Sequence, residues 1–470
     1  MIESQIKDRL TAIVGAENYD DSKAGRLVYS YDATPNFQAM PDAVVSPRDA
    51  QEIAEIVKIC NSSKIPIVPR GSGTNLCAGT CPTEGGIVLL FRRMNRVLEI
   101  DEENLTVTVQ PGAITLDMIN QVEARGLFYP PDPSSMKIST IGGNINENSG
   151  GLRGLKYGVT RDYVIGLEAV LANGDIIKTG GKLAKDVAGY DFTRLFVGSE
   201  GTLGIITEAT LKLIPLPETK KTMLALYQDL EAAAKSVSKI ISQKIIPATL
   251  EFLDQPTLKV VEDFAQIGLP TDVQAVLLIE QDGPHEVVER DMQKMAEVCK
   301  EQGAFSVQVA RSEAEAEALR TARRAALSAL ARLKPTTILE DATVPRSEIA
   351  KMVKAINEIS HKYGLSICTF GHAGDGNLHP TCPADARDHD EMERVEKAFE
   401  EIFIKAIELG GTITGEHGVG VMKAPYLELK LGQEGIAAMK AVKNALDPNN
   451  ILNPGKVFAK DSRKRVVVTK

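Results

Sequence analysis

The chain contains 470 residues, more than one ordinary hydrophobic core accommodates, so at least two domains are expected. An apolar fraction of 43% and a charged fraction of 25% are typical of a globular protein with a full core. The formal net charge of -9 excludes the dense basic face that a nucleic acid or an anionic membrane surface requires.

The amino-terminal stretch MIESQIKDRL is charged and lacks an apolar signal region, and no segment approaches the ~20 apolar residues of a membrane span. We therefore expect a cytoplasmic protein with no membrane span and no nucleic-acid partner. The six cysteines are scattered without a CxxC pair, which favours reduced thiols and leaves no cluster for an iron–sulfur centre. The basic cluster Arg463-Lys464-Arg465 is interpreted as a solvated end of the chain.

Predicted strands alternate with predicted helices over residues 42–126. Residues 49–64 carry the i, i+3, i+4, i+7 stripe of a helix packed on a sheet, at Ile53, Ile56, Val57 and Cys60. A short β-branched strand over 65–68 then runs into the loop PRGSGTN, residues 69–75. Backbone N–H groups in such a loop can line a concavity for phosphate oxygens, and glycine permits the close approach. Alone, the loop is equally compatible with a plain surface turn, because it is neither a GxGxxG fingerprint nor a P-loop.

A second loop region, rich in glycine and asparagine, follows a predicted strand over 105–110 and a predicted helix over 114–125. It consists of PPDPSS, residues 130–135, and TIGGNINENSGG, residues 140–151. Two separate loops of small residues indicate a ligand with an extended phosphate bridge and a planar head. A third signal starts at KDVAGYD and ends with GSEGTLGIIT, residues 198–207.

The segments PRGSGTN, PPDPSS, IGGNINENSGG, KYG and VGSEGTLGIIT, in this order and spacing, resemble the FAD-binding domain of the vanillyl-alcohol oxidase superfamily. The resemblance extends over roughly residues 38–215 and implies two α+β subdomains with FAD between them. It puts the pyrophosphate on 70–75, the flavin ring near 141–158, and the adenine and ribose beside 200–206, with Asn453 returning to the flavin. The FAD-binding residues that the resemblance implies are Arg70, Gly71, Ser72, Gly73, Thr74, Asn75, Pro131, Asp132, Ser135, Ile141, Gly142, Gly143, Asn146, Ser149, Gly150, Gly151, Tyr157, Gly158, Glu200, Gly201, Gly204, Ile206 and Asn453.

The composition of the sequence changes near Pro215-Leu216-Pro217. The glycine-rich loops stop there, and a domain boundary is expected. From there to about residue 425, strands such as 276–280 alternate with amphipathic helices. The expected helices are 286–302, 346–363 and an arginine-bearing helix over 319–333. We therefore expect an α+β fold with an FAD-binding domain over 1–217, a cap domain for substrate and metal over 218–425, and a segment over 426–470 that returns to the FAD-binding domain.

Candidate metal ligands concentrate in GHAGDGNLHP, residues 371–380, and TITGEHGVG, residues 412–420. Glycines between His372 and His379 allow the backbone to fold back and bring both imidazoles to one point. With Glu416 they form a set of two histidines and one carboxylate, which suits zinc or ferrous iron with positions open for a substrate. Asp375 fits either a further ligand or a residue that fixes the turn or accepts a hydrogen bond from a histidine.

The same two segments resemble the carboxyl-terminal half of the FAD-linked D-2-hydroxy-acid dehydrogenases, which include D-lactate dehydrogenases, D-2-hydroxyglutarate dehydrogenases and the flavin subunit of bacterial glycolate oxidase. By this likeness His372, His379 and Glu416 bind a divalent metal, Fe2+ or Zn2+ with Mn2+ as an alternative. The likeness also implies that His417 is the catalytic base. The family also uses an arginine for the substrate carboxylate; here the candidate is Arg323, with alternates Arg320 and Arg324. Ordinary side-chain roles are expected for the remaining histidines, His285, His361 and His389.

These parts suit oxidation of a 2-hydroxy acid to a 2-oxo acid. The hydroxyl and one carboxylate oxygen chelate the metal, His417 removes the hydroxyl proton, and a hydride passes to the flavin. Pro380-Thr381 stands where hydroxyglutarate enzymes tend to carry asparagine, and Leu339-Glu340-Asp341 offers no lysine for a second carboxylate. A small monocarboxylate is therefore favoured, D-lactate first and glycolate next.

The reduced flavin needs an acceptor, and no second cofactor motif is visible. We expect a separate soluble carrier, either an electron-transferring flavoprotein or an iron–sulfur subunit. Three alternatives stay open: a non-redox lyase of the alkylglycerone-phosphate synthase type, the flavin subunit of a multi-subunit glycolate oxidase, and a non-catalytic scaffold subunit. The lack of a basic phosphate-binding set around 372–420 speaks against the lyase, and the intact ionisable set speaks against the scaffold.

Overall fold

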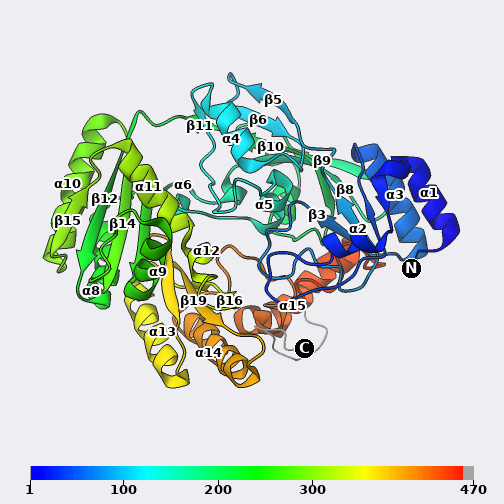
Figure 1. Ribbon diagram of the computed structural model, residues 1–470. Helices are drawn as coiled ribbons and strands as arrows, with labels where there is room; N and C mark the ends of the chain where they lie inside the picture. Colours follow the sequence, from blue (N-terminus) through cyan, green and yellow to red (C-terminus); the bar gives the residue numbers. More distant parts are fainter. Residues whose placement is uncertain (1, 459–470) are drawn as a thin grey trace.

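The computed structural model describes residues 2–458 and arranges its helices around four β-sheets (Figure 1). Antiparallel pairing predominates and helices cover the sheets, so the expected α+β class is confirmed. The basic cluster at 463–465 lies outside the described residues. Within residues 2–458, no helix is both long and apolar enough to cross a membrane.

The amino-terminal sheet has the strand order β1-β2-β4-β3, and α3 (Ala50–Ser63) connects two strands that both run parallel to β4. The Asp49 side chain caps α3 by accepting a hydrogen bond from the Glu52 N–H. The predicted apolar stripe of this helix is fully buried, which confirms the helix. The other elements of this region are α1 (Ser4–Val14), β1 (Tyr19–Asp20), α2 (Lys23–Val28), β2 (Ala43–Val45), β3 (Ile67–Arg70) and β4 (Ile87–Leu90).

A second, antiparallel sheet has the order β5-β6-β10-β8-β9 and packs one face against α4 and α5. The strand and helix expected over 105–110 and 114–125 are β6 and α4, each slightly shorter than expected. The glycine- and asparagine-rich segment forms α5 (Ile141–Glu147), where the Thr140 hydroxyl accepts a hydrogen bond from the Gly143 N–H. The other elements are β5 (Val97–Asp101), β6 (Thr106–Val109), α4 (Thr115–Glu123), β7 (Leu127–Phe128), α6 (Gly154–Tyr157), β8 (Val164–Val170), β9 (Ile176–Gly180), α7 (Phe192–Phe196), β10 (Ile205–Lys212) and β11 (Ile214–Pro215).

The cap is built on a sheet with the order β15-β12-β14-β13-β18-β19-β16, in which β17 also pairs with β19. Its strands are β12 (Thr219–Tyr227), β13 (Thr249–Asp254), β14 (Ala275–Gly283), β15 (Ser306–Val309), β16 (Thr336–Leu339), β17 (Ala342–Thr343), β18 (Cys368–His372) and β19 (Asn377–Ala384). Its helices are α8 (Leu230–Ser242), α9 (Gln255–Ala265), α10 (His285–Glu301), α11 (Glu313–Arg324), α12 (Ala326–Leu330), α13 (Ile349–Tyr363) and α14 (His389–Glu408).

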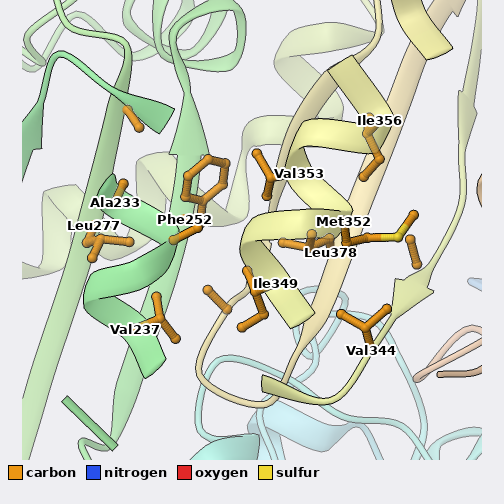
Figure 2. Close-up of a cluster of buried hydrophobic side chains, with 14 of the residues drawn as sticks. Ala233, Val237, Phe252, Leu277, Val344, Ile349, Met352, Val353, Ile356 and Leu378 are labelled. Atoms are coloured by element: carbon orange, nitrogen blue, oxygen red, sulfur yellow. The ribbon is translucent and has the colours of Figure 1, made fainter. Parts of the chain in front are cut away.

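Both faces of the cap sheet are buried. Met223 and Ala225 of β12 belong to the core formed with α8, α10, α13 and α14, whereas Leu224 and Leu226 belong to the core formed with α9, α11 and α12. This alternation follows the two-residue period of a strand. Figure 2 shows the first core, in which labelled side chains of α8 and α13 lie near Phe252 of the sheet.

Two cap helices depart from their predicted bounds. The arginine-bearing helix expected over 319–333 begins six residues earlier, at Glu313, because Ser312 caps it there and acidic residues favour a helix amino terminus. Helical structure then stops at Leu330, with α11 and α12 separated at Ala325. The helix expected over 346–363 begins with a short 3₁₀ turn, so α13 itself starts at Ile349.

The chain finally returns from the cap to the amino-terminal half. It runs through α15 (Leu427–Leu446), which is kinked at Gly432. Residues 451–453 then lie beside β3: the Ile67 N–H donates to the Ile451 carbonyl at 2.7 Å, and the Asn453 N–H donates to the Ile67 carbonyl at 2.8 Å. The end of the described chain therefore extends the edge of the first sheet.

Candidate active site

A cavity of about 520 Å³ lies between the amino-terminal half and the cap. The amino-terminal half contributes residues of the loops 71–76 and 133–140 and of the segment 143–150, which includes the end of α5. The cap contributes Arg323, Arg324, Leu327, Ser328, Leu339, Phe370, His379, Glu416 and His417. The glycine-rich loops and the candidate ligands of the cap therefore face the same space.

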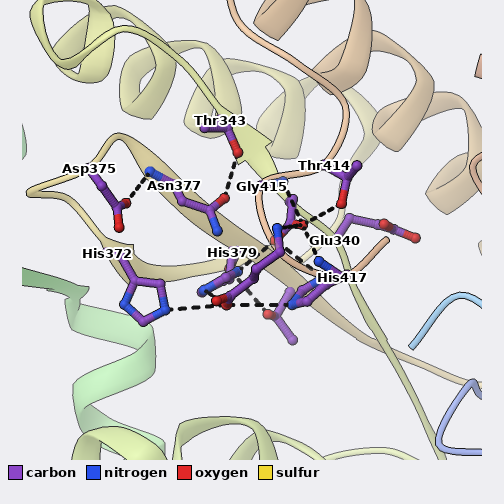
Figure 3. A network of polar contacts seen from close by, with 12 residues as sticks. Glu340, Thr343, His372, Asp375, Asn377, His379, Thr414, Gly415 and His417 are labelled. Carbon is purple, nitrogen blue, oxygen red and sulfur yellow. Dashed lines mark hydrogen bonds and ion pairs between the residues drawn. The ribbon is translucent and has the colours of Figure 1, made fainter. Parts of the chain in front are cut away.

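Four ionisable side chains of the cap converge beside this cavity, and Figure 3 shows the three imidazoles directed toward one another. Glu416 Oε1 lies 3.3 Å from His372 Nε2, 3.3 Å from His379 Nε2 and 3.9 Å from His417 Nε2. The rings of His379 and His417 are stacked, with centroids 5.2 Å apart. The residues that the sequence singles out thus lie together, while the role of each stays a prediction.

The hairpin of β18 and β19 brings the first two histidines together. His372 ends β18 and His379 lies near the start of β19. The turn between them needs glycine at Gly376, which has φ 90 and where a Cβ would lie 2.1 Å from a carbonyl oxygen. The Asn377 N–H donates to Asp375 Oδ1 at 3.2 Å, which favours the reading of Asp375 as a residue that fixes the turn.

Two buried carboxylates that the sequence analysis missed lie behind the imidazoles. Glu251 of β13 is 2.7 Å from His372 Nδ1, and Asp341 is 3.1 Å from His379 Nδ1 and 3.2 Å from His417 Nδ1. A carboxylate opposite Nδ1 fixes the ring and leaves Nε2 for a ligand. The available signal was an acidic residue inside or directly after an apolar strand, as in TLEFLD and TILED.

Asp341 has further partners. Its Oδ2 accepts hydrogen bonds from the N–H groups of Gly415 at 3.0 Å and of Glu416 and His417 at 3.2 Å each. Ligand atoms of Asp341, His379, Glu416 and His417 lie within 4.8 Å of one another, so distance alone admits Asp341 as a metal ligand. Because its oxygens already face backbone and imidazole donors, a supporting role suits it better.

The charges of the cluster shift its pKa values. Burial opposes the charged form of His372, but Glu251 and Glu416 outweigh it and raise the pKa well above its usual value. Burial likewise disfavours ionised Glu416, but His372 and His379 outweigh it and hold the Glu416 pKa well below its usual range. At His417 burial dominates and lowers the pKa to about 4. His417 is therefore neutral at pH 7 in the metal-free protein, the form that accepts a proton.

The donor atoms fit a divalent metal. Three imidazole Nε2 atoms lie within 3.9 Å of Glu416 Oε1, and each Nδ1 faces a carboxylate on its other side. His372 lies outside the group whose ligand atoms are all within 4.8 Å of one another, so it is the outermost of the proposed ligands. Nitrogen and oxygen donors of this kind bind zinc and ferrous iron, and outer carboxylates that orient the imidazoles accompany such sites.

Arg320 is one of three candidates for the substrate carboxylate, and it does not line the cavity. Its guanidinium is buried and pairs with Glu280, Glu313 and Glu317. These partners engage the donors that a substrate would need, so the structure argues against this alternate.

Arg323 and Arg324 both line the cavity. Arg323 pairs with Glu251 at 2.6 Å, and its guanidinium carbon lies 4.8 Å from the centroid of the Phe370 ring. Its Nε has no hydrogen-bond partner among residues 2–458, so a donor remains. Arg324 lies 3.3 Å from Asp132, which ties α11 to the amino-terminal half.

Most residues expected to bind FAD line this cavity or an adjoining one that shares Gly71 with it. They are Arg70, Gly71, Ser72, Gly73, Thr74, Asn75, Ser135, Gly142, Gly143, Asn146, Ser149, Gly150, Glu200, Gly201, Gly204, Ile206 and Asn453. The following line neither cavity: Pro131, Asp132, Ile141, Gly151, Tyr157 and Gly158. Three of these have structural partners instead: Asp132 pairs with Arg324, Ile141 packs in the core of the second sheet, and the Tyr157 hydroxyl donates to Asp282 of the cap at 2.8 Å.

The cradle residues fit FAD. On the amino-terminal side of the two cavities and at Asn453, three buried polar atoms of lining residues lack a hydrogen-bond partner within the described chain: Asn75 Nδ2, Glu147 Oε2 and Asn453 Oδ1. Burial, helped by the charge of Glu200, raises the pKa of Glu147 well above its usual value, which favours the neutral carboxyl. Buried polar atoms need partners, and a nucleotide cofactor offers both donors and acceptors. At Gly201 a Cβ would meet Pro69 at 2.5 Å, so glycine is required there.

Two family models match the chain. The model described as FAD linked oxidases, C-terminal domain, matches residues 216–457, and the FAD binding domain model matches residues 41–180. The glycolate oxidase subunit GlcD of Bacillus subtilis (strain 168) is 76% identical over 467 residues, covering 99% of each chain. A D-lactate dehydrogenase of Anaerostipes hadrus is 37% identical over 433 residues, covering 90% of each chain.

Solved structures share the fold. A p-cresol methylhydroxylase structure has a TM-score of 0.81 at 20% identity, covering 97% of this chain and 96% of that chain. An alkyldihydroxyacetonephosphate synthase structure has a TM-score of 0.77 at 20% identity, covering 97% and 86%. At such identity the likeness concerns the fold alone. It confirms the expected two-subdomain FAD-binding fold with a cap.

Proposed function

Because this chain belongs to the family of FAD-linked oxidases, we propose that it uses FAD and a divalent metal to oxidise a small D-2-hydroxy acid to the 2-oxo acid. One observation carries the proposal. His372, His379, Glu416 and His417 meet beside the cavity that the glycine-rich loops also line. A scaffold has no need of this set of neutral and charged imidazoles next to a flavin cradle.

When bound, FAD would accept a hydride, and a divalent cation held by His372, His379 and Glu416 would polarise the hydroxyl and carboxylate oxygens of the substrate. His417, neutral because of its burial, takes the hydroxyl proton. Asp341 opposite Nδ1 stabilises the imidazolium that results. Arg323 orients the substrate carboxylate through N–H groups that its ion pair with Glu251 does not use.

Two substrates are proposed. The lack of a cationic partner for a second carboxylate in Leu339-Glu340-Asp341 favours a small monocarboxylate, with D-lactate first from the sequence. The relative at 76% identity is named for glycolate, which supports glycolate equally. The two acids share the hydroxyl and carboxylate that the site would hold and differ by one methyl group, a difference worth about 1–3 kcal/mol in an apolar pocket.

The electron acceptor is proposed to be a separate protein. Relatives of this chain are named as subunits of glycolate oxidase, which supports the reading as the flavin subunit of a larger enzyme. An iron–sulfur subunit or an electron-transferring flavoprotein would then reoxidise the flavin.

The test is anaerobic reduction of the bound flavin by a panel of 2-hydroxy acids, followed by stopped-flow absorbance. We expect D-lactate and glycolate to bleach the flavin, with L-lactate and D-2-hydroxyglutarate much slower. A flavin that stays oxidised with every member of the panel would reject the proposal and favour the lyase.

A further inference from the structure

The segment Gly415–Gly420, termed the His417 loop, is held by buried carboxylates from both halves of the molecule. On the cap side, Asp341 accepts hydrogen bonds from the N–H groups of the first three residues of the loop. On the other side, Glu200 of the amino-terminal half accepts the Val419 N–H with Oε1 and the Gly420 N–H with Oε2, each at 2.7 Å. Both carboxylates are buried, so these hydrogen bonds form away from competing water.

Two more contacts hold the loop against the amino-terminal half. Cys77 Sγ donates to the Gly418 carbonyl at 3.3 Å, and the Cys77 carbonyl accepts the Val421 N–H at 2.8 Å. Gly418 lies close to the cradle, because a Cβ there would lie 2.2 Å from Glu147 Oε2 and would displace that side chain. The loop is thus seated closely on the residues that line the flavin cradle.

The backbone of Glu200 is held in an unusual state. Its φ is 53, a left-handed conformation that residues with a Cβ adopt at a cost. The Glu200 N–H donates to the Asn146 carbonyl at 2.9 Å, and Asn453 Nδ2 donates to the Glu200 carbonyl at 2.7 Å. Glycine or asparagine would suit this conformation better, so what glutamate adds is its carboxylate.

We propose that Glu200 is a positioning residue that locks the His417 loop onto the amino-terminal half and so fixes the His417 imidazole relative to the flavin cradle. The sequence predicts a different role, contact with adenine and ribose. Glu200 lines the cradle, yet both of its carboxylate oxygens are engaged by the cap loop. The expected effect on turnover rests on the proposed function; the lock itself does not.

The test uses the FAD- and metal-loaded enzyme and the variants Glu200→Asn and Glu200→Gln. Asparagine favours the left-handed conformation but is too short to reach the two N–H groups, so it removes the lock without adding backbone strain. Glutamine keeps the length and one acceptor oxygen. Glu103→Asn changes the same charge at an exposed residue between β5 and β6 and serves as the control.

We expect E200N to keep its FAD and to melt at a lower temperature than the wild type, because two buried N–H groups lose their acceptor. Its kcat should fall by about 10- to 100-fold with little change in KM, as for the loss of two hydrogen bonds that position a catalytic group. E200Q should recover part of kcat, and E103N should match the wild type. Hydrogen–deuterium exchange of a peptide covering 416–421 should quicken by about tenfold or more in E200N.

Two results would overturn the proposal: E200N that retains FAD with kcat within twofold of the wild type, or variants that lose FAD while turnover per bound FAD is unchanged. The exchange measurement distinguishes failure of the Glu200 proposal from failure of the proposed function. If the wild type reduces its flavin with no hydroxy acid but exchange at 416–421 still quickens in E200N, the proposed function fails and the lock stands. Unchanged exchange refutes the lock whatever the substrate.

Discussion

The imidazole cluster of the cap and the glycine cradle of the amino-terminal half face one cavity, but they satisfy their polar groups differently. In the cluster, each imidazole Nδ1 lies opposite a buried carboxylate, Glu251 or Asp341. In the cradle, polar atoms such as Glu147 Oε2 and Asn453 Oδ1 have no partner within residues 2–458. Charge pairs therefore dominate in the cluster, although His417 Nδ1 and Arg323 Nε also lack a hydrogen-bond partner within residues 2–458, whereas the open atoms of the cradle are left for what it binds. We expect changes in one region to leave ligand binding in the other region intact.

The largest expected effect is at His417. His417→Ala should keep FAD and metal but lose about 10²- to 10⁴-fold in turnover, because it removes the base and little else. Anaerobic flavin reduction by D-lactate or glycolate measures this, with the exposed His361→Ala as control. Unchanged activity would remove His417 from the mechanism. Loss of FAD would contradict the expectation that a change in the cluster leaves FAD binding in the cradle intact.

The buried state of His417 also predicts a pH dependence of stability in metal-free protein. Its folded pKa of about 4 lies below the unfolded value. The stability that the neutral imidazole contributes is thus present above pH 6.5 and is lost as the pH falls toward 4. Between pH 7 and 4.5 the wild type should lose about 2–3 kcal/mol more free energy of unfolding than His417→Gln. Urea unfolding of both proteins at the two pH values measures the difference. Equal losses of unfolding free energy in the wild type and His417→Gln would contradict the prediction.

A smaller effect is expected behind the cluster. Asp341→Asn should weaken metal binding by about 10- to 100-fold, because the carboxylate orients two imidazoles. FAD content should not change. Titration of chelator-treated protein with a divalent metal gives the affinity, and Asp263→Asn on the exposed face of α9 is the control. Equal losses of metal and FAD would show that the cluster does not assemble independently.

The smallest effect is expected in the cradle. Gly201→Ala should weaken FAD binding by about tenfold, since its Cβ would lie 2.5 Å from Pro69 and the backbone there must shift. Gly126→Ala is a matched control, because its φ of 70 is close to the 68 of Gly201 but a Cβ would meet nothing within 4 Å. FAD dissociation measures the difference, and metal affinity should stay the same in both variants. If both variants bound FAD equally well, the contact between a Cβ at position 201 and Pro69 would have no effect on FAD binding, and the steric explanation would be wrong.

Local patterns predicted the fold and the family, and less of the site. The stripe of α3 and the loops of α5 could be interpreted because period and glycine content are properties of neighbouring residues. The roles of Glu251 and Asp341 could not be predicted, because they depend on tertiary structure. The two acids approach the histidines only once β13 and β16 lie beside β18 and β19. Glu200 was given a ligand contact from its motif, although its carboxylate binds a loop more than two hundred residues away.

The pairing of residues 451–453 with β3 has a consequence for biosynthesis. A chain leaving the ribosome exposes β3 early, yet the neighbour of that strand emerges only when translation is nearly finished. The edge of the amino-terminal sheet therefore stays unpaired while the whole cap is synthesised. Unpaired strand edges of this kind are prone to aggregation. Premature termination anywhere in α15 would leave that edge permanently bare and deprive Glu200 of the Asn453 amide that holds it.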